Sequence, residues 1–280
     1  MRWQQPNHRC RNFSPCIATI PRKPLSEKAK HGIFGIMNPN SSNSDHITEA
    51  LPFVIRSVRD EAELAKAVAI RRSAYGRHVP ELAARFTAPE PSDLDGSSRV
   101  LVALAKLDGM PLGSMRYRTN QYQPLDLEQS VTLPAALRNR VLTEATRLAV
   151  SQAAVGRVVK AMLMKAMYLQ CEAGGIQTMV VTARHPMDRF YHWLLFEDVY
   201  PGGEFIPMKH VGMIPHRVMA CDVVETKRRW QSVDHPWYSL FFEMHHPDID
   251  LTPFPVVTAR EEREPDGTRT TARTRHRDMR

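Results

Sequence analysis

The chain has 280 residues, of which 42% are hydrophobic, enough to build the core of one large domain or two small ones. Its formal net charge of +8 would suit a protein that binds nucleic acid, but the excess lies mainly at the two ends. Residues 1–50 carry 7 basic and 3 acidic side chains, residues 258–280 carry 7 and 5, and residues 51–257 carry 24 and 22. This distribution argues against a central domain that binds polyanions.

The patterns of cysteine, histidine and hydropathy argue against several other classes of protein. The four cysteines show neither Cys-x-x-Cys spacing nor a disulfide framework. The twelve histidines form no His-Glu-x-x-His motif and no other regular ligand spacing, so we expect no metal site. No apolar run approaches the roughly 20 residues of a membrane span. We therefore expect a cytoplasmic protein without stable membrane insertion.

The two ends of the chain differ from its middle. Residues 1–50 mix Pro, Asn, Ser and isolated charges without periodicity, and the last 23 residues alternate Arg, Thr, Glu and Asp. We expect residues 1–50 and 251–280 to be disordered, because such segments bury too little apolar surface to offset the entropy of ordering. An arm that binds nucleic acid is the alternative for these ends, and Met37 is an alternative start of translation. Residues 51–250 are expected to form one domain.

Hydrophobic periodicity predicts the elements of that domain. We expect strands at 52–58, 99–106, 111–118, 142–150, 176–182 and 217–224. We expect helices at 61–75, 152–173 and 186–195, with short helical segments within 76–86 and 133–140. The order predicts the α/β (α+β) class, with a mixed sheet and helices on its faces.

The expected strand at 142–150 contains two charged residues, Glu144 and Arg147, among apolar neighbours. A charge in such a position must be paired, be solvated in a cleft, or take part in chemistry. Residues three apart on a regular strand face opposite sides of the sheet. We therefore predict a β-bulge between Glu144 and Val150, which would bring the two side chains to one side. A buried ion pair that only orients strands is the structural alternative.

The order of elements and four short motifs resemble the Gcn5-related N-acyltransferase (GNAT) fold. In particular, the chain resembles the long-chain N-acyl amino acid synthase family (FeeM type), over about residues 52–250. The motifs are Arg72-Ser-Ala-Tyr-Gly-Arg-His78, Gly109-Met-Pro-Leu-Gly-Ser-Met-Arg116, Glu144-Ala-Thr-Arg-Leu-Ala-Val150 and Ala183-Arg-His-Pro-Met-Asp-Arg-Phe-Tyr191.

Residue roles follow from the related acyl-homoserine-lactone synthase branch of this fold. That branch has an Arg in the first helix, acidic residues before the second strand, an Arg on the third strand and Glu-x-x-Arg on the fourth. The resemblance implies catalytic roles for Glu144, as base or amine anchor, and for Arg147. It implies substrate-binding roles for Arg72 or its neighbour Arg71, Asp95 or Asp93, Arg116, Arg118 and Tyr191. In relatives that use coenzyme A, a Tyr in the last helix can protonate the leaving thiolate.

One departure from the fold family concerns the acyl donor. Relatives that depend on coenzyme A have a glycine-rich loop after the fourth strand, whose backbone N–H groups hold the pyrophosphate. The segment here is Gln152-Ala-Ala-Val-Gly-Arg157, with Val155 and Arg157 at positions where the family has small residues. A donor attached to acyl carrier protein would lose less from this change. Basic residues near the long helix could attract such an acidic carrier, or could simply be solvated. They are Arg138, Arg140, Arg157, Lys160 and Lys165.

We therefore expect an N-acyltransferase that moves a long-chain acyl group from acyl carrier protein to the amine of an amino acid, without a resident cofactor. The acyl donor is a substrate, either acyl carrier protein or acyl-coenzyme A. One alternative enzyme is an acyl-homoserine-lactone synthase, and another is an acetyl-coenzyme-A-dependent N-acetyltransferase. The alternative from another class is a catalytically inactive regulatory or nucleic-acid-binding module.

Overall fold

The computed structural model describes residues 47–251. The expectations for the two ends therefore fall outside the described residues, apart from residues 47–50 and 251. Within the described part no helix is long and apolar enough to cross a membrane.

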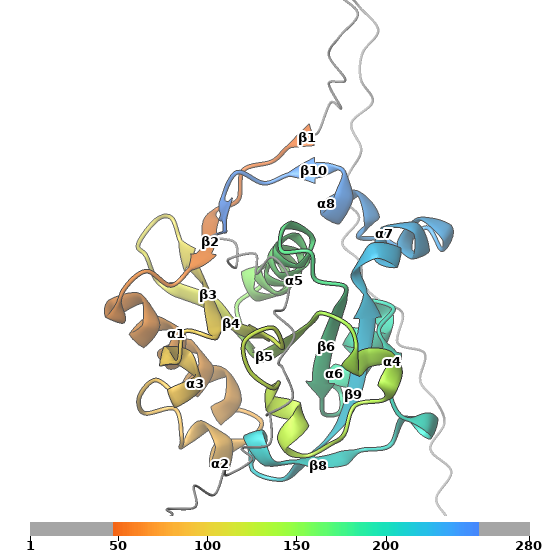
Figure 1. Ribbon diagram of the computed structural model, residues 1–280. Coiled ribbons are helices and arrows are strands. Elements are labelled where there is room, and N and C mark those ends of the chain that lie inside the picture. Colours follow the sequence, from red (N-terminus) through yellow and green to blue (C-terminus); the bar gives the residue numbers. More distant parts are fainter. Residues whose placement is uncertain (1–46, 252–280) are drawn as a thin grey trace, which may run out of the picture. The chain divides into compact units, whose positions relative to one another are not determined.

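A mixed sheet with the order β11-β2-β3-β4-β5-β6-β9-β7 forms the centre of the fold (Figure 1). Its strands are β2 (Phe53–Ser57), β3 (Ser98–Ala105), β4 (Pro111–Thr119), β5 (Leu142–Val150), β6 (Thr178–Ala183), β7 (Glu197–Asp198), β9 (Ile214–Asp222) and β11 (Ile249–Asp250). β5 and β6 pair in parallel, as do β11 and β2, and the other neighbours are antiparallel. β8 (Ile206–Met208) pairs with β9, and β1 (Ile47–Thr48) pairs with β10 (Met244–His245).

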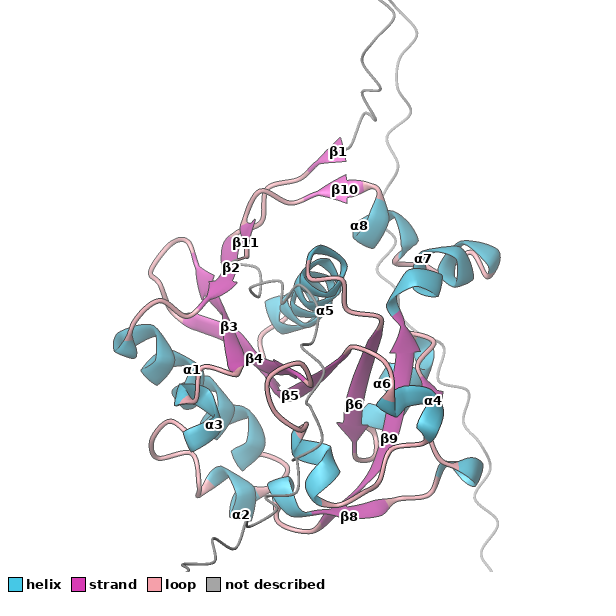
Figure 2. Cartoon of the chain, in the orientation of Figure 1, coloured by secondary structure: helices cyan, strands magenta, loops and turns pink. Residues whose placement is uncertain are grey.

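Helices cover both faces of this sheet (Figure 2). α5 (Val155–Ala173) lies on one face, while α1 (Glu61–Gly76), α2 (Pro80–Ala83) and α3 (Pro91–Leu94) lie on the other. The remaining helices are α4 (Ala135–Arg138), α6 (Met187–Trp193), α7 (Val223–Ser232) and α8 (Tyr238–Phe242), and the 3-10 turns are η1 (Asp126–Gln129), η2 (Pro201–Gly203) and η3 (Lys209–Val211). The expected mixed sheet with flanking helices is confirmed.

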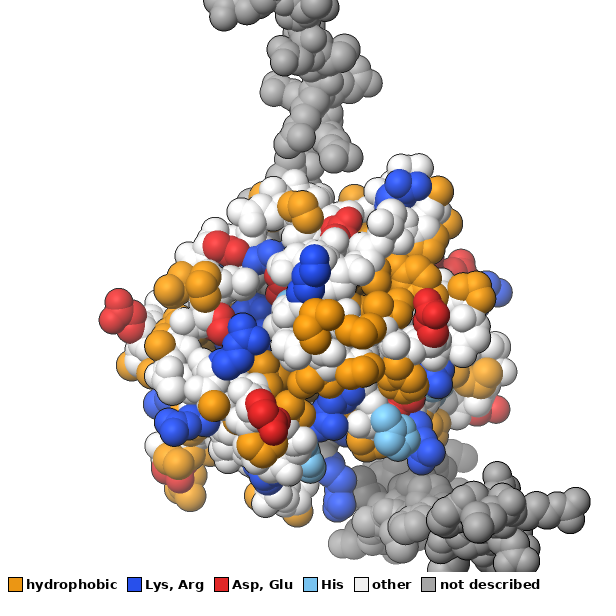
Figure 3. Space-filling model, turned by 90° about the horizontal axis from the view of Figure 1, so that it is seen from below, with side chains coloured by type: hydrophobic (Ala, Val, Ile, Leu, Met, Phe, Trp, Pro, Cys, Tyr) orange, Lys and Arg blue, Asp and Glu red, His pale blue; other side chains and the backbone are white. Residues whose placement is uncertain are grey.

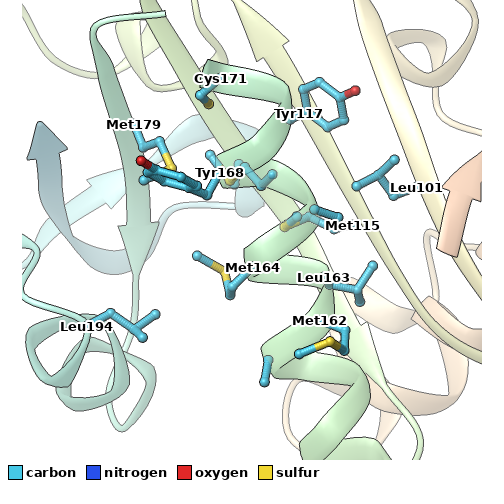
Figure 4. Close-up of a cluster of buried hydrophobic side chains, with 14 of the residues drawn as sticks. Leu101, Met115, Tyr117, Met162, Leu163, Met164, Tyr168, Cys171, Met179 and Leu194 are labelled. Carbon is cyan, nitrogen blue, oxygen red and sulfur yellow. The ribbon is translucent and has the colours of Figure 1, made fainter. Parts of the chain in front are cut away.

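The alternation of side chains along β4 assigns a different character to each face. Met115 and Tyr117 belong to the apolar core beneath α5, together with Met162 and Leu163 of that helix (Figure 4). Arg116 and Arg118 point to the opposite face, where α1 and α3 lie. Because successive residues of a strand face opposite ways, one strand serves an apolar core and a charged one.

Close packing of α5 on β4 depends on Gly113. A Cβ atom at this position would lie 2.6 Å from Cγ1 of Val159 and 3.1 Å from Cδ1 of Leu163. Both of these side chains are buried. Any residue other than glycine at position 113 would therefore hold α5 farther from β4.

We expect Gly113→Ala to lower the free energy of unfolding by about 1–3 kcal/mol, because the added methyl group overpacks the core. Urea denaturation followed by circular dichroism measures the change. Gly76→Ala is the matched control, since its Cβ would make only an ordinary 3.9 Å contact with Ala83. Equal effects of the two substitutions would contradict this account of the helix–strand contact.

Candidate functional site

The site begins where two parallel strands separate. β5 pairs with β6 only from Leu142 to Ala145, opposite Thr178 to Val181. β5 nevertheless continues to Val150, so the edge of residues 146–150 that faces away from β4 is not paired with β6. Loss of the ladder leaves a cleft between the strands, and both pockets described below open into it.

The predicted β-bulge is present at this point. Ser114 pairs with Ala149 and Arg116 pairs with Thr146, so two residues of β5 lie opposite one residue of β4. The first of the two is Arg147, whose φ of 57° places it in the left-handed region. This conformation is unfavourable for a residue other than glycine, and a bulge is one of the few settings that tolerate it.

The bulge turns Arg147 toward the α1 face, but its partner is not Glu144. Its guanidinium donates to Glu90, from Nε at 2.6 Å and from Nη2 at 2.7 Å, and Nη2 also donates to the backbone oxygen of His210 at 3.0 Å. The arginines nearby, Arg147 and Arg116 foremost, lower the pKa of Glu90 to about 2 against the opposing effect of burial. Glu90 is therefore a permanent anion that holds Arg147 in place.

Four buried arginines and four carboxylates, of which Asp95 is exposed, form a charge network on this face. Arg71 donates to both oxygens of Asp93, at 2.9 and 2.8 Å. Arg116 contacts three carboxylates, and Arg118 contacts two. The members of the network are Arg71, Arg116, Arg118, Arg147, Glu90, Asp93, Asp95 and Asp126. Because each buried charge has an opposite partner, the cost of desolvating it is offset.

Glu144 is a fifth carboxyl group beside this balanced network. It is buried, and its Oε2 accepts a hydrogen bond from the backbone N–H of Leu127 at 3.2 Å. Its Oε1 has no hydrogen-bond partner among the described residues. Burial, together with the nearby Asp126, raises the pKa of Glu144 to about 8. The group is therefore largely protonated at neutral pH, and it lines neither pocket.

The larger pocket, of about 230 Å³, has a cationic lining. Four cationic side chains and no carboxylate contribute to it. They are Arg77, Arg147, Lys160 and Arg184. The backbone and side chains of residues 145–150 form one wall, and Met187 and Tyr191 of α6 form part of another. Desolvation by burial raises the pKa of Tyr191, so its phenol keeps its proton. Such a lining favours an anionic ligand with an apolar part.

The smaller pocket, of about 50 Å³, shares part of this wall. It contains His210, whose Nε2 lies 3.2 Å from Oγ1 of Thr182, and the aliphatic side chains of Val79, Leu82 and Ile214. Burial, with the charge of Arg147 as the next cause, lowers the pKa of His210 to about 4. The imidazole is therefore neutral at neutral pH.

Of the residues predicted to bind substrate, some belong to the charge network and others line a pocket. Three of them are engaged in ion pairs and line neither pocket. Arg118 pairs with Asp95 and Asp126, and Arg116 pairs with Glu90. Tyr191 does line the larger pocket. On α1, Arg72 lies on the exposed face, and the neighbouring Arg71 is the one that joins the network.

The five basic residues predicted to attract a carrier do not form one surface. Arg138 and Arg140 precede β5, whereas Arg157 and Lys160 follow it, and a strand of nine residues spans about 30 Å. Arg140 also pairs with Asp222 at 2.6 Å. Lys165 is 2% exposed, and its ammonium donates to the backbone oxygens of Leu240 and Met244. Contrary to expectation, Lys165 therefore joins α5 to α8 and β10 inside the protein.

Sequence reasoning missed Glu90, Asp126, Thr182 and His210. Glu90 and Asp126 lie in irregular segments, where periodicity carries no information about burial. Thr182 was placed on its strand correctly, but its contact with His210 joins residues 28 positions apart. Within residues 47–251, no three His, Cys, Asp or Glu side chains are grouped so that they could hold a metal ion.

No family model matches the chain, and no curated protein matches it. Solved structures similar to it include FeeM, an N-acyl amino acid synthase from uncultured soil microbes, at 18% identity and a TM-score of 0.49 over 65% of this chain and 96% of that one. They include the coenzyme-A-dependent acyl-homoserine lactone synthase BjaI, at 15% identity and a TM-score of 0.48 over 69% and 93%. A GNAT superfamily phosphinothricin acetyltransferase from Sinorhizobium meliloti has 20% identity and a TM-score of 0.41 over 61% and 89%.

The raised pKa of Glu144 predicts a pH dependence of stability. Between pH 4.5, the ordinary pKa of the group, and about 8, the folded protein holds a proton that the unfolded chain has released. The free energy of unfolding should therefore fall as the pH rises through this range. Glu144→Gln removes the titration, so its stability relative to the wild type should improve by about 2–4 kcal/mol from pH 4.5 to pH 8.

Chemical denaturation at several pH values between 4 and 9 measures this difference. Glu61→Gln, on the exposed first turn of α1, is the control for loss of a carboxyl group outside the site. A difference between Glu144→Gln and the wild type that stays constant with pH would show that the carboxyl group is ionised in the folded state.

Proposed function

We propose that the chain is an N-acyltransferase that moves a fatty acyl group from a carrier-bound thioester to the amine of an amino acid. The observation that carries the proposal is the cleft between β5 and β6, lined by four cationic side chains without a carboxylate. This lining favours an anionic ligand that also has an uncharged part. A thioester on a phosphopantetheine arm has both, because the arm joins an anionic phosphate to a long uncharged chain. The cationic lining would hold the phosphate, and the unpaired edge of β5 would lie along the chain.

The reaction requires stabilisation of a tetrahedral oxyanion, a proton acceptor for the amine and a proton donor for the thiolate. Backbone N–H groups on the unpaired edge of β5 are suited to the oxyanion, because they are held rigidly by the pairing of β5 with β4. Tyr191 is suited to the thiolate by its position, because its side chain lines the larger pocket. The cationic side chains of the smaller pocket, Arg147 and Arg184, would attract the carboxylate of the acceptor.

The start of α5 favours a protein-bound donor over free coenzyme A. A Cβ atom on Gly156 would lie 2.1 Å from the backbone oxygen of Ser151, so the turn before the helix is tight. The side chain of Arg157 is exposed, and Lys160 lines the larger pocket while its ammonium lies 3.9 Å from the ring centroid of Phe190. Two basic residues three positions apart on α5, one of them in the lining of the larger pocket, would suit an acidic carrier protein. Basic, acidic and apolar side chains are mixed over the face shown in Figure 3.

An acyl-homoserine-lactone synthase is the second candidate, because Arg71, Asp93 and Arg116 of the network, with Glu144 beside it, match the residues that its branch of the fold would supply. It differs in consuming S-adenosylmethionine. Incubation of the protein with acyl carrier protein thioesters of several chain lengths and a mixture of amino acids, followed by mass spectrometry, tests the proposal. An N-acyl amino acid supports it. A homoserine lactone formed only with S-adenosylmethionine selects the second candidate, and no acyl product from either mixture contradicts both.

If the donor is bound to a carrier protein, charge reversal near the start of α5 should change KM for that carrier. Arg157→Glu combined with Lys160→Glu should raise KM for an acylated carrier by about tenfold or more, since like charges repel the acidic partner. Steady-state kinetics at low and high salt measures the effect, which should shrink as salt screens it. Arg138→Glu is the control at the other end of β5 and should leave KM unchanged. An equal rise in KM for acyl-pantetheine, which carries no phosphate and no protein, would contradict an electrostatic role.

A further inference from the structure

The two pockets share a wall, and each also has titratable groups of its own. The shared residues are Tyr75, Thr146, Arg147, Thr182, Arg184 and His216. His210 lines only the smaller pocket, and Tyr191 lines only the larger one. If the donor occupies the larger pocket, an acceptor in the smaller pocket would meet the thioester along the shared wall.

Thr182 is the shared residue that connects this wall to His210. Its Oγ1 lies 3.2 Å from Nε2 of His210, within hydrogen-bond distance. The other ring nitrogen, Nδ1, is buried and has no hydrogen-bond partner among the described residues. Burying a polar nitrogen without a hydrogen bond lowers the free energy of unfolding. Such an atom therefore suggests a role in function or in ligand binding.

The surroundings of His210 keep its imidazole unprotonated. Cationic groups face it from β4 and β5, namely Arg116 and Arg147, and His216 faces it from β9. Asp126 of η1 acts in the opposite direction. Burial and the nearby cations outweigh the carboxylate, so without a ligand the ring is neutral at pH 7 and only a weak base. A carboxylate bound in the smaller pocket would offset the cations and make the ring more basic.

We infer that Thr182 and His210 form a proton relay that takes the proton from the acceptor amine. As the amine nitrogen bonds to the thioester carbon, the carbonyl electron pair moves to the oxygen. The amine proton passes to Oγ1 of Thr182, while the hydroxyl proton of Thr182 passes to Nε2 of His210. The oxyanion then re-forms the carbonyl, the carbon–sulfur bond breaks, and the thiolate takes a proton from Tyr191. The imidazolium of His210 returns its proton to solvent, and the Tyr191 phenolate regains one.

This inference rests on the proposed acyl transfer, and it assigns the proton transfer to a group other than Glu144. The carboxyl group of Glu144 is buried beside the charge network, lines neither pocket and is largely protonated at neutral pH. Thr182, in contrast, borders both pockets. The two assignments differ in which substitution removes activity.

Kinetics of N-acyl amino acid formation by the full chain, between pH 6 and pH 10, tests the relay. Thr182→Val and His210→Gln should each lower kcat by about 10²-fold or more at pH 7, the usual effect of losing an acid–base group. KM for the acylated carrier should change little. Thr182→Ser keeps the hydroxyl and should retain most of the activity. The loss in both variants should shrink toward pH 10, because hydroxide can then take the proton that the attacking amine loses.

Matched controls separate the relay from general damage to the fold. Thr178→Val makes the same change on the same strand, at a buried hydroxyl that has no hydrogen-bond partner and lies outside both pockets. His245→Gln changes an exposed histidine. Both should behave as the wild type.

The possible results separate failure of the relay from failure of the proposed function. If the wild type forms no N-acyl product, the proposed function fails. If it forms product and Thr182→Val retains full kcat at pH 7, the relay is wrong. A loss in Thr182→Val that is equally large at pH 7 and pH 10 also overturns it, since the defect would then be structural. Loss of activity in Glu144→Gln with retention in Thr182→Val would assign the proton transfer to Glu144.

Discussion

The functional architecture depends on one residue of β5 that adopts a left-handed backbone conformation. Arg147 sits at the β-bulge with a φ of 57°, which costs about 1–2 kcal/mol for a residue with a Cβ atom. Its two hydrogen bonds to Glu90 and one to the backbone of His210 offset that cost. The bulge places Arg147 on the face that Glu144 occupies, and it lies just beyond the point where β5 stops pairing with β6. The β-bulge at Arg147 therefore contributes both to the shape of the cleft and to its charge.

The protein separates two kinds of charge that its sequence mixes. On the α1 face, four buried arginines are paired with four carboxylates, so they form a rigid support. In the cleft, cationic side chains line the larger pocket without a carboxylate among them. Arg147 belongs to both groups, because Glu90 binds one side of its guanidinium while the residue also lines both pockets. This arrangement leaves a net positive cleft in a domain whose total charge is nearly balanced.

The titratable groups on the two sides of the shared wall, Tyr191 and His210, are both uncharged at neutral pH. Burial keeps the phenol of Tyr191 protonated on the side of the larger pocket, and burial with nearby cations keeps His210 neutral on the side of the smaller one. The same physical cause, removal from water, favours the uncharged form of both groups. The same shift makes the phenol a weaker acid and the imidazole a weaker base, so a bound anion that offsets the nearby cations would be needed to make His210 more basic.

The sequence by itself determined the class of fold, the order of the main elements and the presence of the bulge, because these follow from local periodicity and from the cost of placing charge in a strand. It also identified Arg147 and Tyr191, which line the cleft, and Glu144, which lies behind it. Only the tertiary structure decided which charges pair. Glu90, and not Glu144, binds Arg147 from 57 positions away, Arg71 faces the network in place of Arg72, and Lys165 lies inside the protein. Pairing between distant segments depends on how strands separate and how loops cross them, and local sequence carries no information on distances of that kind.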